Sequence, residues 1–380
     1  MQDIHEAVHR GRAQFKHQFK SPARAHRRAN LPAPMSFQIT LKPSDRAFTV
    51  DADEAILPAA IRQGVGLPYG CRDGACGSCK SRLLDGSVAH GPHQSKALSA
   101  DEEASGWILT CCARPQTDCV VEARSVPGAG EYPVLKLPSR VLGITRPAAD
   151  VAVLKLQLPA NQNLQYRAGQ YVEFILRDGA RRSYSMANAP HLLGSPPAIE
   201  LHVRHMPGGK FTDHVFGAMK EKDILRMEGP FGSFFLREES IKPMVLLASG
   251  TGFAPVKALI QQLQHKASTR PAVLYWGGRR PADLYETAWC EQAAAELSWL
   301  RYVPVVSHAL PEDGWAGRTG FVHHAVMQDF PDLSAHQVYA CGAPIVVASA
   351  QSDFVAVCGL PADEFFADSF TSEADKNAVA

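Results

Sequence analysis

The chain has 380 residues, of which 46% are hydrophobic and 20% charged, a globular composition that excludes disordered and fibrous proteins. Its length predicts two or three domains, and because no run of 18 apolar residues occurs, we expect no membrane span. A formal net charge of +1 argues against a nucleic-acid binder, which would need a strongly basic surface.

The basic residues are concentrated at the start of the chain. Residues 1–34 hold seven Lys and Arg against two acidic residues, whereas the rest holds 32 basic and 36 acidic residues, a net charge of −4. This stretch has neither the apolar core of a secretory signal nor fold-like patterning. We therefore expect a basic leader that is disordered or not translated, with Met35 as the true start, in a cytoplasmic protein. A transit peptide or a tail that contacts acidic surfaces is the alternative.

The next part, residues 35–126, opens with strand-like runs at 37–41 and 46–50 and a helical pattern at 54–63. A loop rich in glycine and cysteine follows at 66–79. Six of the nine cysteines of the chain fall within this part. The chain has an odd total of nine cysteines and no secretory signal, and both facts argue against a disulfide framework. The clustering of six cysteines in one part therefore indicates a metal site.

The spacing of these cysteines indicates which metal group they bind. Cys71, Cys76 and Cys79 form the pattern C-x4-C-x2-C, and Cys111 follows further along the chain. Thiolates hold iron–sulfur clusters, and this is the plant-type 2Fe-2S spacing. Intervening glycines such as Gly74 let the backbone wrap closely around a cluster. A zinc site or unrelated buried thiols are the alternatives, but zinc ribbons usually show two C-x2-C pairs and only one occurs here.

The stretches 66–79 and 107–115 resemble plant-type ferredoxins, and the resemblance extends over about residues 36–125. It implies a β-grasp 2Fe-2S ferredoxin domain whose fourth ligand is Cys111, the cysteine directly after Leu-Thr. Cys112 stays open as an alternative fourth ligand.

Beyond a Gly/Pro-rich linker at 127–133, the pattern changes twice. Residues 134–238 show short alternating runs separated by turns, which predicts an antiparallel β-barrel. Residues 239–371 alternate apolar strand-like runs with helical patterns, which predicts a parallel, doubly wound α/β sheet. Residues 372–380 are read as a tail. The runs that predict strands are 139–144, 151–158, 171–176, 199–204, 244–248, 272–276, 302–306 and 338–341.

Two motifs in the barrel region suit a flavin. Arg182-Ser-Tyr-Ser185 offers a guanidinium that can hold a phosphate, with a ring and a hydroxyl that can contact flavin rings. Gly208 and Gly209 permit close approach of the backbone to a bound group. A surface strand and a simple turn are the alternatives.

A third motif opens the α/β region. Gly250, Thr251 and Gly252 follow the buried run 244–248 and precede a helix, so they can admit a pyrophosphate to the helix N-terminus. Pro255 replaces the third glycine of the dinucleotide fingerprint, so a strict Rossmann match fails.

The order of barrel, R-x-Y-S, Gly-Gly turn and Gly-rich strand–helix turn resembles the ferredoxin–NADP reductase superfamily. The resemblance implies that Arg182 holds the flavin phosphate, Tyr184 contacts its rings and Ser185 lies near its reactive nitrogen. Residues 206–212 resemble the second phosphate element of that family, which implies that Thr212 starts a helix whose N-terminus faces the pyrophosphate. The family usually carries the sequence Gly-Thr-Gly followed by two residues and then Pro, as residues 250–255 do here. The family also places a Cys-Gly pair, here Cys341 and Gly342, beside the nicotinamide, which makes Ser185 and Cys341 the catalytic candidates.

Three further positions depend on this resemblance. Phe370 lies at the position where relatives carry an aromatic ring that faces the flavin. The alternative interpretation of Phe370 is a ring packed in the core near the end of the chain. For Cys341, the alternative is a buried thiol at the end of a strand. Arg279 and Arg280 follow the second α/β strand, where the 2′-phosphate of NADPH would sit, and Asp283 lies too far along to act there. Since relatives with this stretch mostly use NADH, we expect NADH, with NADPH possible.

The complete body, about residues 36–371, resembles reductase components with an N-terminal ferredoxin domain. The resemblance implies an NAD(P)H-dependent oxidoreductase that passes electrons through FAD and a 2Fe-2S cluster to an acceptor protein. Two groups fit, the CDP-6-deoxy-glucoseen reductases and the reductase components of oxygenases or hydroxylases, and the Tyr275-Trp-Gly-Gly stretch favours the first. The acceptor is then a dehydratase or an oxygenase component. A stand-alone flavin reductase and a non-enzymatic redox sensor are further alternatives.

Histidines take no part in this interpretation. His323 and His324 match no ligand spacing, and we expect them to be surface or core residues.

Overall fold

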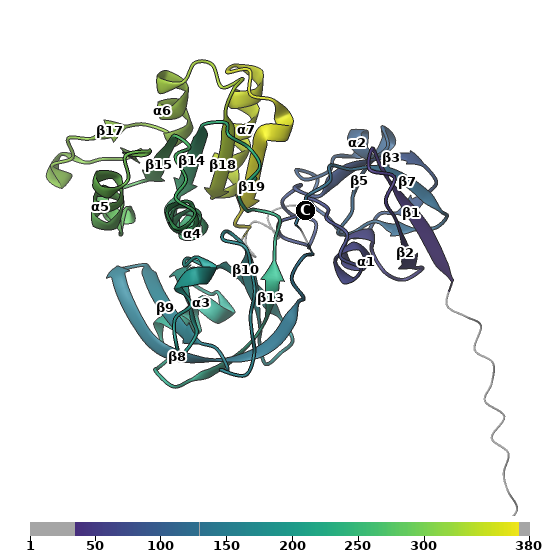
Figure 1. Cartoon of the computed structure of the whole chain (residues 1–380), viewed down its shortest axis with the longest axis horizontal. Helices are drawn as coiled ribbons and strands as arrows, with labels where there is room; N and C mark the ends of the chain where they lie inside the picture. The colour runs from purple at the N-terminus through teal and green to yellow at the C-terminus, as the bar shows by residue number, and fades with distance from the viewer. Residues whose placement is uncertain (1–34, 129, 372–380) are drawn as a thin grey trace, which may run out of the picture. The chain divides into compact units, whose positions relative to one another are not determined.

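The computed structural model describes residues 35–128 and 130–371, and the strands in them form three large sheets and a two-stranded ribbon (Figure 1). The predictions for the leader at 1–34 and the tail at 372–380 lie outside the described residues. The predicted domain boundaries stay predictions; the described strands stop at 122 and 231 and resume at 135 and 244.

The first sheet has the ferredoxin-like order that the cysteine region predicts. Its strand order is β2-β1-β7-β3-β5, with β1 and β7 parallel and the other pairs antiparallel, which confirms the β-grasp fold. The first helix contributes Ile56, Leu57, Ala59 and Ala60 to the buried core. The elements are β1 (Ser36–Lys42), β2 (Ala47–Asp51), α1 (Ile56–Arg62), β3 (Lys80–Asp85), β4 (Val88–Ala89), α2 (Ala100–Ala104), β5 (Trp107–Leu109), β6 (Arg114–Pro115) and β7 (Cys119–Glu122).

The second sheet is antiparallel and closes on itself. Its elements are β8 (Leu135–Ala148), β9 (Val151–Gln157), β10 (Tyr171–Ile175), β11 (Arg181–Ser185), β12 (Ala198–Arg204), α3 (Lys210–Phe216) and β13 (Ile224–Phe231). The strand order is β11-β10-β13-β8-β9-β12. The two outer strands of this order, β11 and β12, contact each other just beyond their ends. Met186 forms a β-bridge with Leu201, and the Ala187 N–H donates to the Glu200 carbonyl at 2.7 Å. The predicted barrel is therefore confirmed.

The third sheet is parallel throughout, with the order β17-β16-β15-β14-β18-β19. This confirms the predicted doubly wound fold and adds two strands, β17 and β19, that the sequence pattern did not predict. The elements are β14 (Met244–Ser249), α4 (Phe253–His265), β15 (Ala272–Gly278), α5 (Thr287–Glu296), β16 (Leu300–Val306), β17 (Arg318–Thr319), α6 (Val322–Asp329), β18 (Gln337–Gly342), α7 (Pro344–Ala356) and β19 (Phe365–Ser369).

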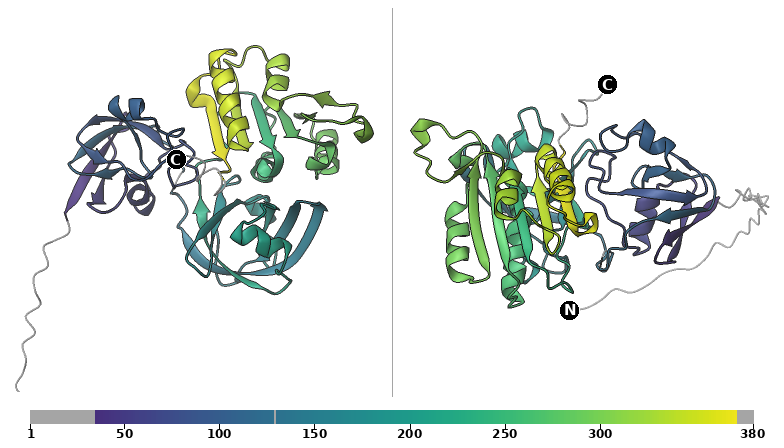
Figure 2. Two further views of the ribbon diagram at one scale, coloured as in Figure 1. Left: turned by 180° about the vertical axis from the view of Figure 1, so that it is seen from behind. Right: turned by 90° about the horizontal axis from the view of Figure 1, so that it is seen from above.

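Strand β14 explains why this sheet needs helices on both faces. Met244, Leu246 and Ala248 belong to one buried cluster, shared with α4 and α5, while Val245 and Leu247 belong to another, shared with α6 and α7 (Figures 1 and 2). A strand that is apolar on both sides is buried only between two helical layers. The chain reverses its winding direction between β14 and β18, and loops at such a point are where α/β sheets bind ligands.

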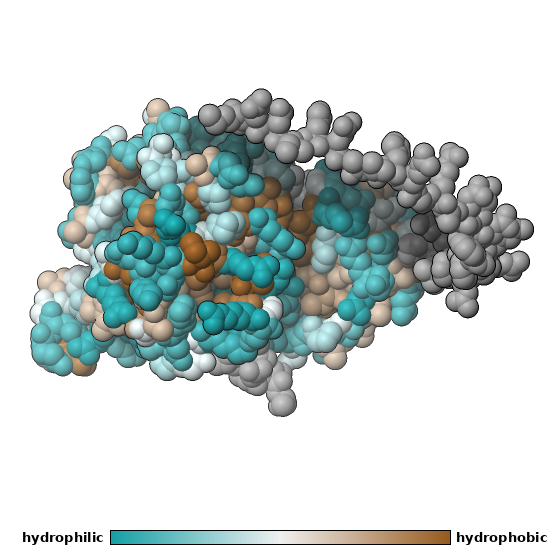
Figure 3. Space-filling model, turned by 90° about the horizontal axis from the view of Figure 1, so that it is seen from below, coloured by the Kyte–Doolittle hydropathy of each residue, from teal (hydrophilic) through white to brown (hydrophobic). Residues whose placement is uncertain are grey.

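Hydrophilic side chains predominate on the face drawn in Figure 3, with apolar ones interspersed among them. The two most exposed large apolar side chains of the described residues lie apart in the chain, Ile241 in the loop before β14 and Ile345 at the start of α7. None of the described helices combines the length and hydrophobicity that crossing a bilayer needs.

Candidate functional site

The four predicted cluster ligands lie on two connections of the β-grasp domain. Cys71, Cys76 and Cys79 occupy the irregular segment between α1 and β3, and Cys111 follows β5. Hydrogen bonding between the thiols raises the pKa of Cys71 and lowers that of Cys76 to about 6. The Cys112 and Cys79 thiols likewise raise the pKa of Cys111. The four thiols therefore lie near one another, Cys71 beside Cys76 and Cys79 beside Cys111, and Cys112 also lies beside Cys111.

The backbone of this loop suits a cluster. Gly74 and Gly77 have φ of +78° and +76°, a conformation that L side chains rarely adopt. A Cβ on Gly74 would also lie 2.9 Å from the Cys112 Sγ. The Cys71 N–H points at the Cys76 Sγ from 3.4 Å, the kind of donor that tunes a cluster potential. The described residues thus fit a thiolate-bound 2Fe-2S group.

Cys112 is a fifth thiol at this site. Its Sγ lies 3.5 Å from the Cys111 Sγ, and it is half-buried, whereas Cys111 is buried. Cys111 is the one whose thiol contacts the Cys79 thiol. The geometry therefore supports Cys111 as the fourth ligand, and this assignment stays a prediction.

We expect Cys112→Ser to retain the iron content and visible absorbance of the wild type, and Cys111→Ser to lose most of both. A serine at 112 removes a neighbour of the cluster, whereas a serine at 111 removes a soft ligand. Iron analysis of the two purified variants checks this. The reverse pattern would assign the fourth ligand to Cys112.

The cysteine loop is bonded to the barrel by side chains that the sequence analysis did not single out. The Tyr171 hydroxyl donates to the Gly70 carbonyl at 2.7 Å, and the Tyr69 N–H donates to the Ser233 Oγ at 2.9 Å. Arg72 forms an ion pair with Glu173, which is nearly buried in β10. In the sequence, Glu173 interrupts the otherwise apolar run Tyr-Val-Glu-Phe-Ile. This isolated charge was the feature that could have predicted a buried ion pair here.

Apolar contacts extend the same junction. Tyr171 and Phe231, at the ends of β10 and β13, belong to the buried cluster that forms the core of the β-grasp domain. The Arg72 guanidinium lies 3.7 Å from the Phe231 ring centroid, within cation–π range. The barrel therefore holds the loop that carries three of the four predicted ligands.

A single cavity of about 2280 Å³ brings most of the predicted site residues together. Its volume exceeds that of a typical small-molecule pocket, so it has room for more than one cofactor. The predicted residues in its lining are Cys71, Cys76, Cys111, Arg182, Tyr184, Ser185, Gly208, Gly209, Thr212, Gly250, Thr251, Arg279 and Phe370. Those that lie outside the lining are Cys79, Gly252, Pro255, Cys341 and Gly342.

The R-x-Y-S motif occupies β11, an outer strand of the barrel sheet. Tyr184 packs at 39° against Phe211, with 4.9 Å between ring centroids, so part of its ring lines the cavity from a fixed position. The Ser185 Oγ donates to a carboxylate oxygen of Asp368 at 3.4 Å. The side chains at 182, 184 and 185 thus fit a flavin, and their individual roles stay predictions.

The Gly-Gly turn differs in detail from the prediction. Helix α3 begins at Lys210 with Gly209 as its N-cap, so Thr212 lies inside the first turn and does not start the helix. The Thr212 hydroxyl instead donates to the Met206 carbonyl at 2.8 Å and accepts from the Met206 N–H at 3.2 Å. Gly208 has φ of +81°, and a Cβ on Gly209 would lie 2.5 Å from the Thr212 Oγ1. The hydroxyl therefore fixes a turn that tolerates only glycine.

The two predicted nicotinamide turns pack directly on each other. A Cβ on Gly252 would lie 2.2 Å from the Cys341 carbonyl oxygen, and one on Gly342 would lie 2.3 Å from the Ser249 carbonyl oxygen. These glycines allow β14 and β18 to come close at the point where the winding reverses. Burial first, and then Asp368, raises the pKa of the Cys341 thiol, which is fully buried. Gly252, Gly342 and Cys341 thus shape the floor behind the cavity lining.

Asp368, in β19, is a site residue that the sequence analysis missed. It is buried and lines the cavity, and its Oδ1 would lie 3.7 Å from a Cβ on Gly70. Burial, followed by the Cys76 thiol, raises the pKa of its carboxyl to about 7. The following Phe370 donates its N–H to the Gly342 carbonyl at 2.8 Å and is half-buried, so it both packs on the core and lines the cavity. In the sequence, the single aspartate within the run Phe-Phe-Ala-Asp-Ser-Phe was the feature that could have predicted a functional carboxylate here.

Asp283 lies closer to the site than its sequence position suggested. Its carboxylate accepts the N–H groups of Arg279 at 2.7 Å and Arg280 at 3.1 Å, and pairs with Arg204 at 3.2 Å. The expectation that it lies too far from the end of β15 is therefore wrong. Burial opposes its ionisation, but these donors hold its pKa below the ordinary value. Arg280 is committed to a two-pronged pair with Asp313, at 2.8 and 2.6 Å.

A buried charged network links the barrel to the α/β domain. Lys257, in α4, contacts Glu200 of β12 at 2.9 Å and Glu286, just before α5, at 2.8 Å. His202 joins the same group through Glu200 at 3.1 Å and the Tyr285 hydroxyl at 2.8 Å. One ammonium group thus neutralises carboxylates from two domains.

Three family models match the three folded parts. A 2Fe-2S iron–sulfur cluster binding domain matches residues 39–116, an oxidoreductase FAD-binding domain matches residues 139–236, and an oxidoreductase NAD-binding domain matches residues 246–352.

Relatives match nearly the full described length. A CDP-6-deoxy-L-threo-D-glycero-4-hexulose-3-dehydrase reductase of Yersinia pseudotuberculosis is 40% identical over 336 residues, covering 88% of this chain and 99% of the relative. Reductase component 2 of terephthalate 1,2-dioxygenase from Comamonas sp. is 36% identical over 343 residues, covering 89% and 98%. The crystal structure of the Amycolatopsis cytochrome P450 reductase GcoB aligns with a TM-score of 0.72 at 34% identity, covering 88% and 99%.

Proposed function

Because the chain belongs to the family of FAD- and NAD-binding reductases that carry a 2Fe-2S ferredoxin domain, we propose that it supplies electrons from NADH to a dehydrase of the hexulose-3-dehydrase kind. The observation that carries this proposal is the 40% identity over 336 residues to the reductase of such an enzyme. A reductase component of an oxygenase is the second candidate, which the Comamonas relative supports.

The three groups divide the chemistry. When bound, a flavin accepts two electrons as hydride from a nicotinamide and releases them singly, which suits a one-electron 2Fe-2S cluster. The residues of this chain supply position. Tyr184 and Phe370 border the cavity with aromatic surface, Ser185 and Asp368 form a hydrogen-bonded pair inside it, and the cysteine loop reaches the same cavity.

For the nucleotide, we propose NADH as the preferred donor. Asp283 places a carboxylate at the end of β15, where it would repel a 2′-phosphate. Arg280 is occupied by Asp313, so it is not available to that phosphate. Arg279 is exposed over 68% of its side chain and can accept NADPH in part.

We expect Arg279→Ala to lower kcat/KM for NADPH about tenfold or more, since it removes a charge-assisted contact, and to change that for NADH less than about threefold. Steady-state kinetics with both donors check this. An equal loss with both nucleotides would show that Arg279 serves binding in general and does not read the 2′ position.

The acceptor is tested by reconstitution with purified holoenzyme and NADH under anaerobic conditions. The proposal expects electron delivery to a hexulose-3-dehydrase at a rate well above that to an aromatic-ring dioxygenase component or to free flavin. Faster delivery to the dioxygenase component would favour the second candidate. Fast reduction of free flavin alone would favour a stand-alone flavin reductase.

We also propose a cytoplasmic location. None of the nine cysteines, all of which lie in the described residues, is in a disulfide, and four of them are the proposed cluster ligands; this usage suits a reducing compartment, in which the proposed donor NADH is also found. Cell fractionation with an antibody to the chain tests this.

A further inference from the structure

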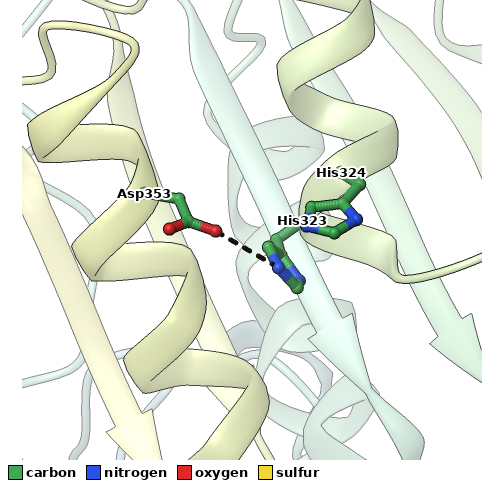
Figure 4. A group of neighbouring side chains, drawn as sticks. All are labelled: His323, His324 and Asp353. Carbon is green, nitrogen blue, oxygen red and sulfur yellow. Dashed lines mark ion pairs between the residues drawn. The ribbon is translucent and has the colours of Figure 1, made fainter.

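Two helices on one face of the α/β sheet bring together two imidazoles and a carboxylate. His323 and His324 lie in the first turn of α6, and Asp353 lies near the end of α7 (Figure 4). One ligand atom from each residue lies within 4.8 Å of the others. Sequence spacing could not show this group, because the carboxylate comes from a separate helix.

The central imidazole is built into the fold. The His323 side chain is only 10% exposed, and its Nε2 lies 3.4 Å from an Asp353 carboxylate oxygen. Its Nδ1 is buried with no hydrogen-bond partner among the described residues. The nitrogen that faces Asp353 is Nε2, so Nε2 is the atom that can share a ligand with the Asp353 carboxylate.

From this arrangement we infer that His323, His324 and Asp353 form a binding site for one divalent transition-metal ion of the Zn²⁺ class, separate from the iron–sulfur cluster. Two imidazoles and one carboxylate suit such ions, at about 2.0–2.2 Å per bond, and leave further coordination positions for water. For all three residues to bind one ion, their ligand atoms must move closer together than the separations of up to 4.8 Å seen here. Exposed His324 and half-buried Asp353 can rotate to do so, and the Asp353 charge offsets the positive end of α6.

A bound ion would fasten two helices that border the cavity. Val322, directly before His323, would lie 2.8 Å from a Cβ on Gly277 at the end of β15. Phe321 and Val322, together with the first turn of α7, belong to the cavity lining. The ion would therefore restrain the wall of the site without touching its interior.

A second group of metal-binding type does not compete with this assignment. Glu200, His202 and Glu286 also lie within reach of one another. The Lys257 ammonium, at 2.9 and 2.8 Å from the two carboxylates, already fills the cation position between them.

The test is calorimetric titration of Zn²⁺ into the holoenzyme, whose cluster thiols are already ligated. His324→Gln and Asp353→Asn change side chains that are not buried, so both variants are expected to fold. We expect each to lose the same single Zn²⁺ site, or to bind there at least tenfold more weakly. His265→Gln is the matched control, because His265 and His191 are stacked at 3.9 Å without a carboxylate in the group.

Iron content and flavin absorbance must match the wild type in all variants, which separates this site from the cluster and the flavin. Two results would overturn the inference. One is an unchanged titration in both variants. The other is a loss confined to His324→Gln with Asp353→Asn unaffected, which would indicate an adventitious surface imidazole.

Discussion

Replacing Cys76 with serine is expected to deplete the 2Fe-2S group and to reduce NADH-dependent reduction of cytochrome c by roughly 100-fold or more, because serine is a poor ligand for iron in such clusters. Reduction of ferricyanide, which can take electrons from the flavin directly, should stay within about twofold. Cys76 is chosen because its thiol contacts both Cys71 and Ser78 in the centre of the loop. The two acceptor assays are run on one preparation, together with iron analysis.

Cys119→Ser is the matched control for this variant. Cys119 is also a buried thiol of the β-grasp domain, but it lies in β7, and its Sγ contacts the carbonyls of Ser87 and Thr117 at 3.5 and 3.2 Å. It should keep both activities. An iron-free Cys76→Ser protein with undiminished cytochrome c reduction would contradict the proposed route and favour a stand-alone flavin reductase.

Replacing Lys257 with methionine is expected to destabilise the holoenzyme by about 2–4 kcal/mol, because two poorly exposed carboxylates lose their shared cation. Glu200 and Glu286 are 29% and 18% exposed, so water screens them in part and the loss is smaller than for a fully buried group. Thermal unfolding, monitored by the fluorescence of released flavin, should show a melting temperature lower than that of the wild type by about 5–10 °C.

The pH dependence of this effect has a definite sign. In the wild type, desolvation of Glu200 is outweighed by His202 and Lys257, which hold its pKa at about 2. Its ionised form therefore stabilises the fold above the ordinary pKa of about 4.5, and this contribution is lost only as the pH falls toward 2. Without the ammonium the carboxyl takes up a proton earlier, so the deficit of the variant should shrink below about pH 5.

Lys266→Met provides the matched control at the end of the same helix. Its ammonium lies 3.6 Å from Glu238, and the two side chains are 56% and 45% exposed. An exposed pair of this kind contributes at most about 1 kcal/mol. Equal melting temperatures for Lys257→Met and the wild type would show that the network does not hold the two domains together.

The sequence predicted the three folds because each has a local signature. The C-x4-C-x2-C spacing, the alternating runs of the barrel and the buried run of β14 each depend on residues close together in the chain. The strands β17 and β19 were missed for the same reason, since two residues at 318–319 and the mixed run Phe-Phe-Ala-Asp-Ser carry no clear period.

The site was predicted where it depends on motifs and missed where it depends on long-range contacts. Asp368 meets Ser185 across 183 residues, and Arg72 meets Glu173 across 101. Nothing in spacing links such pairs. The helix start was misassigned to Thr212 because glycine and threonine are both acceptable N-cap residues. In the structure Gly209 is the N-cap, and the Thr212 hydroxyl donates to the Met206 carbonyl instead.

The bonds from Tyr171 to Gly70 and from Ser233 to Tyr69 have a kinetic consequence. A carrier that is fixed to its donor by the same polypeptide does not have to be found by diffusion, so the internal transfer is first order and independent of dilution. Only the final transfer remains bimolecular. Its rate is then expected to rise with the concentration of the acceptor protein, whereas the rate of the internal step is not.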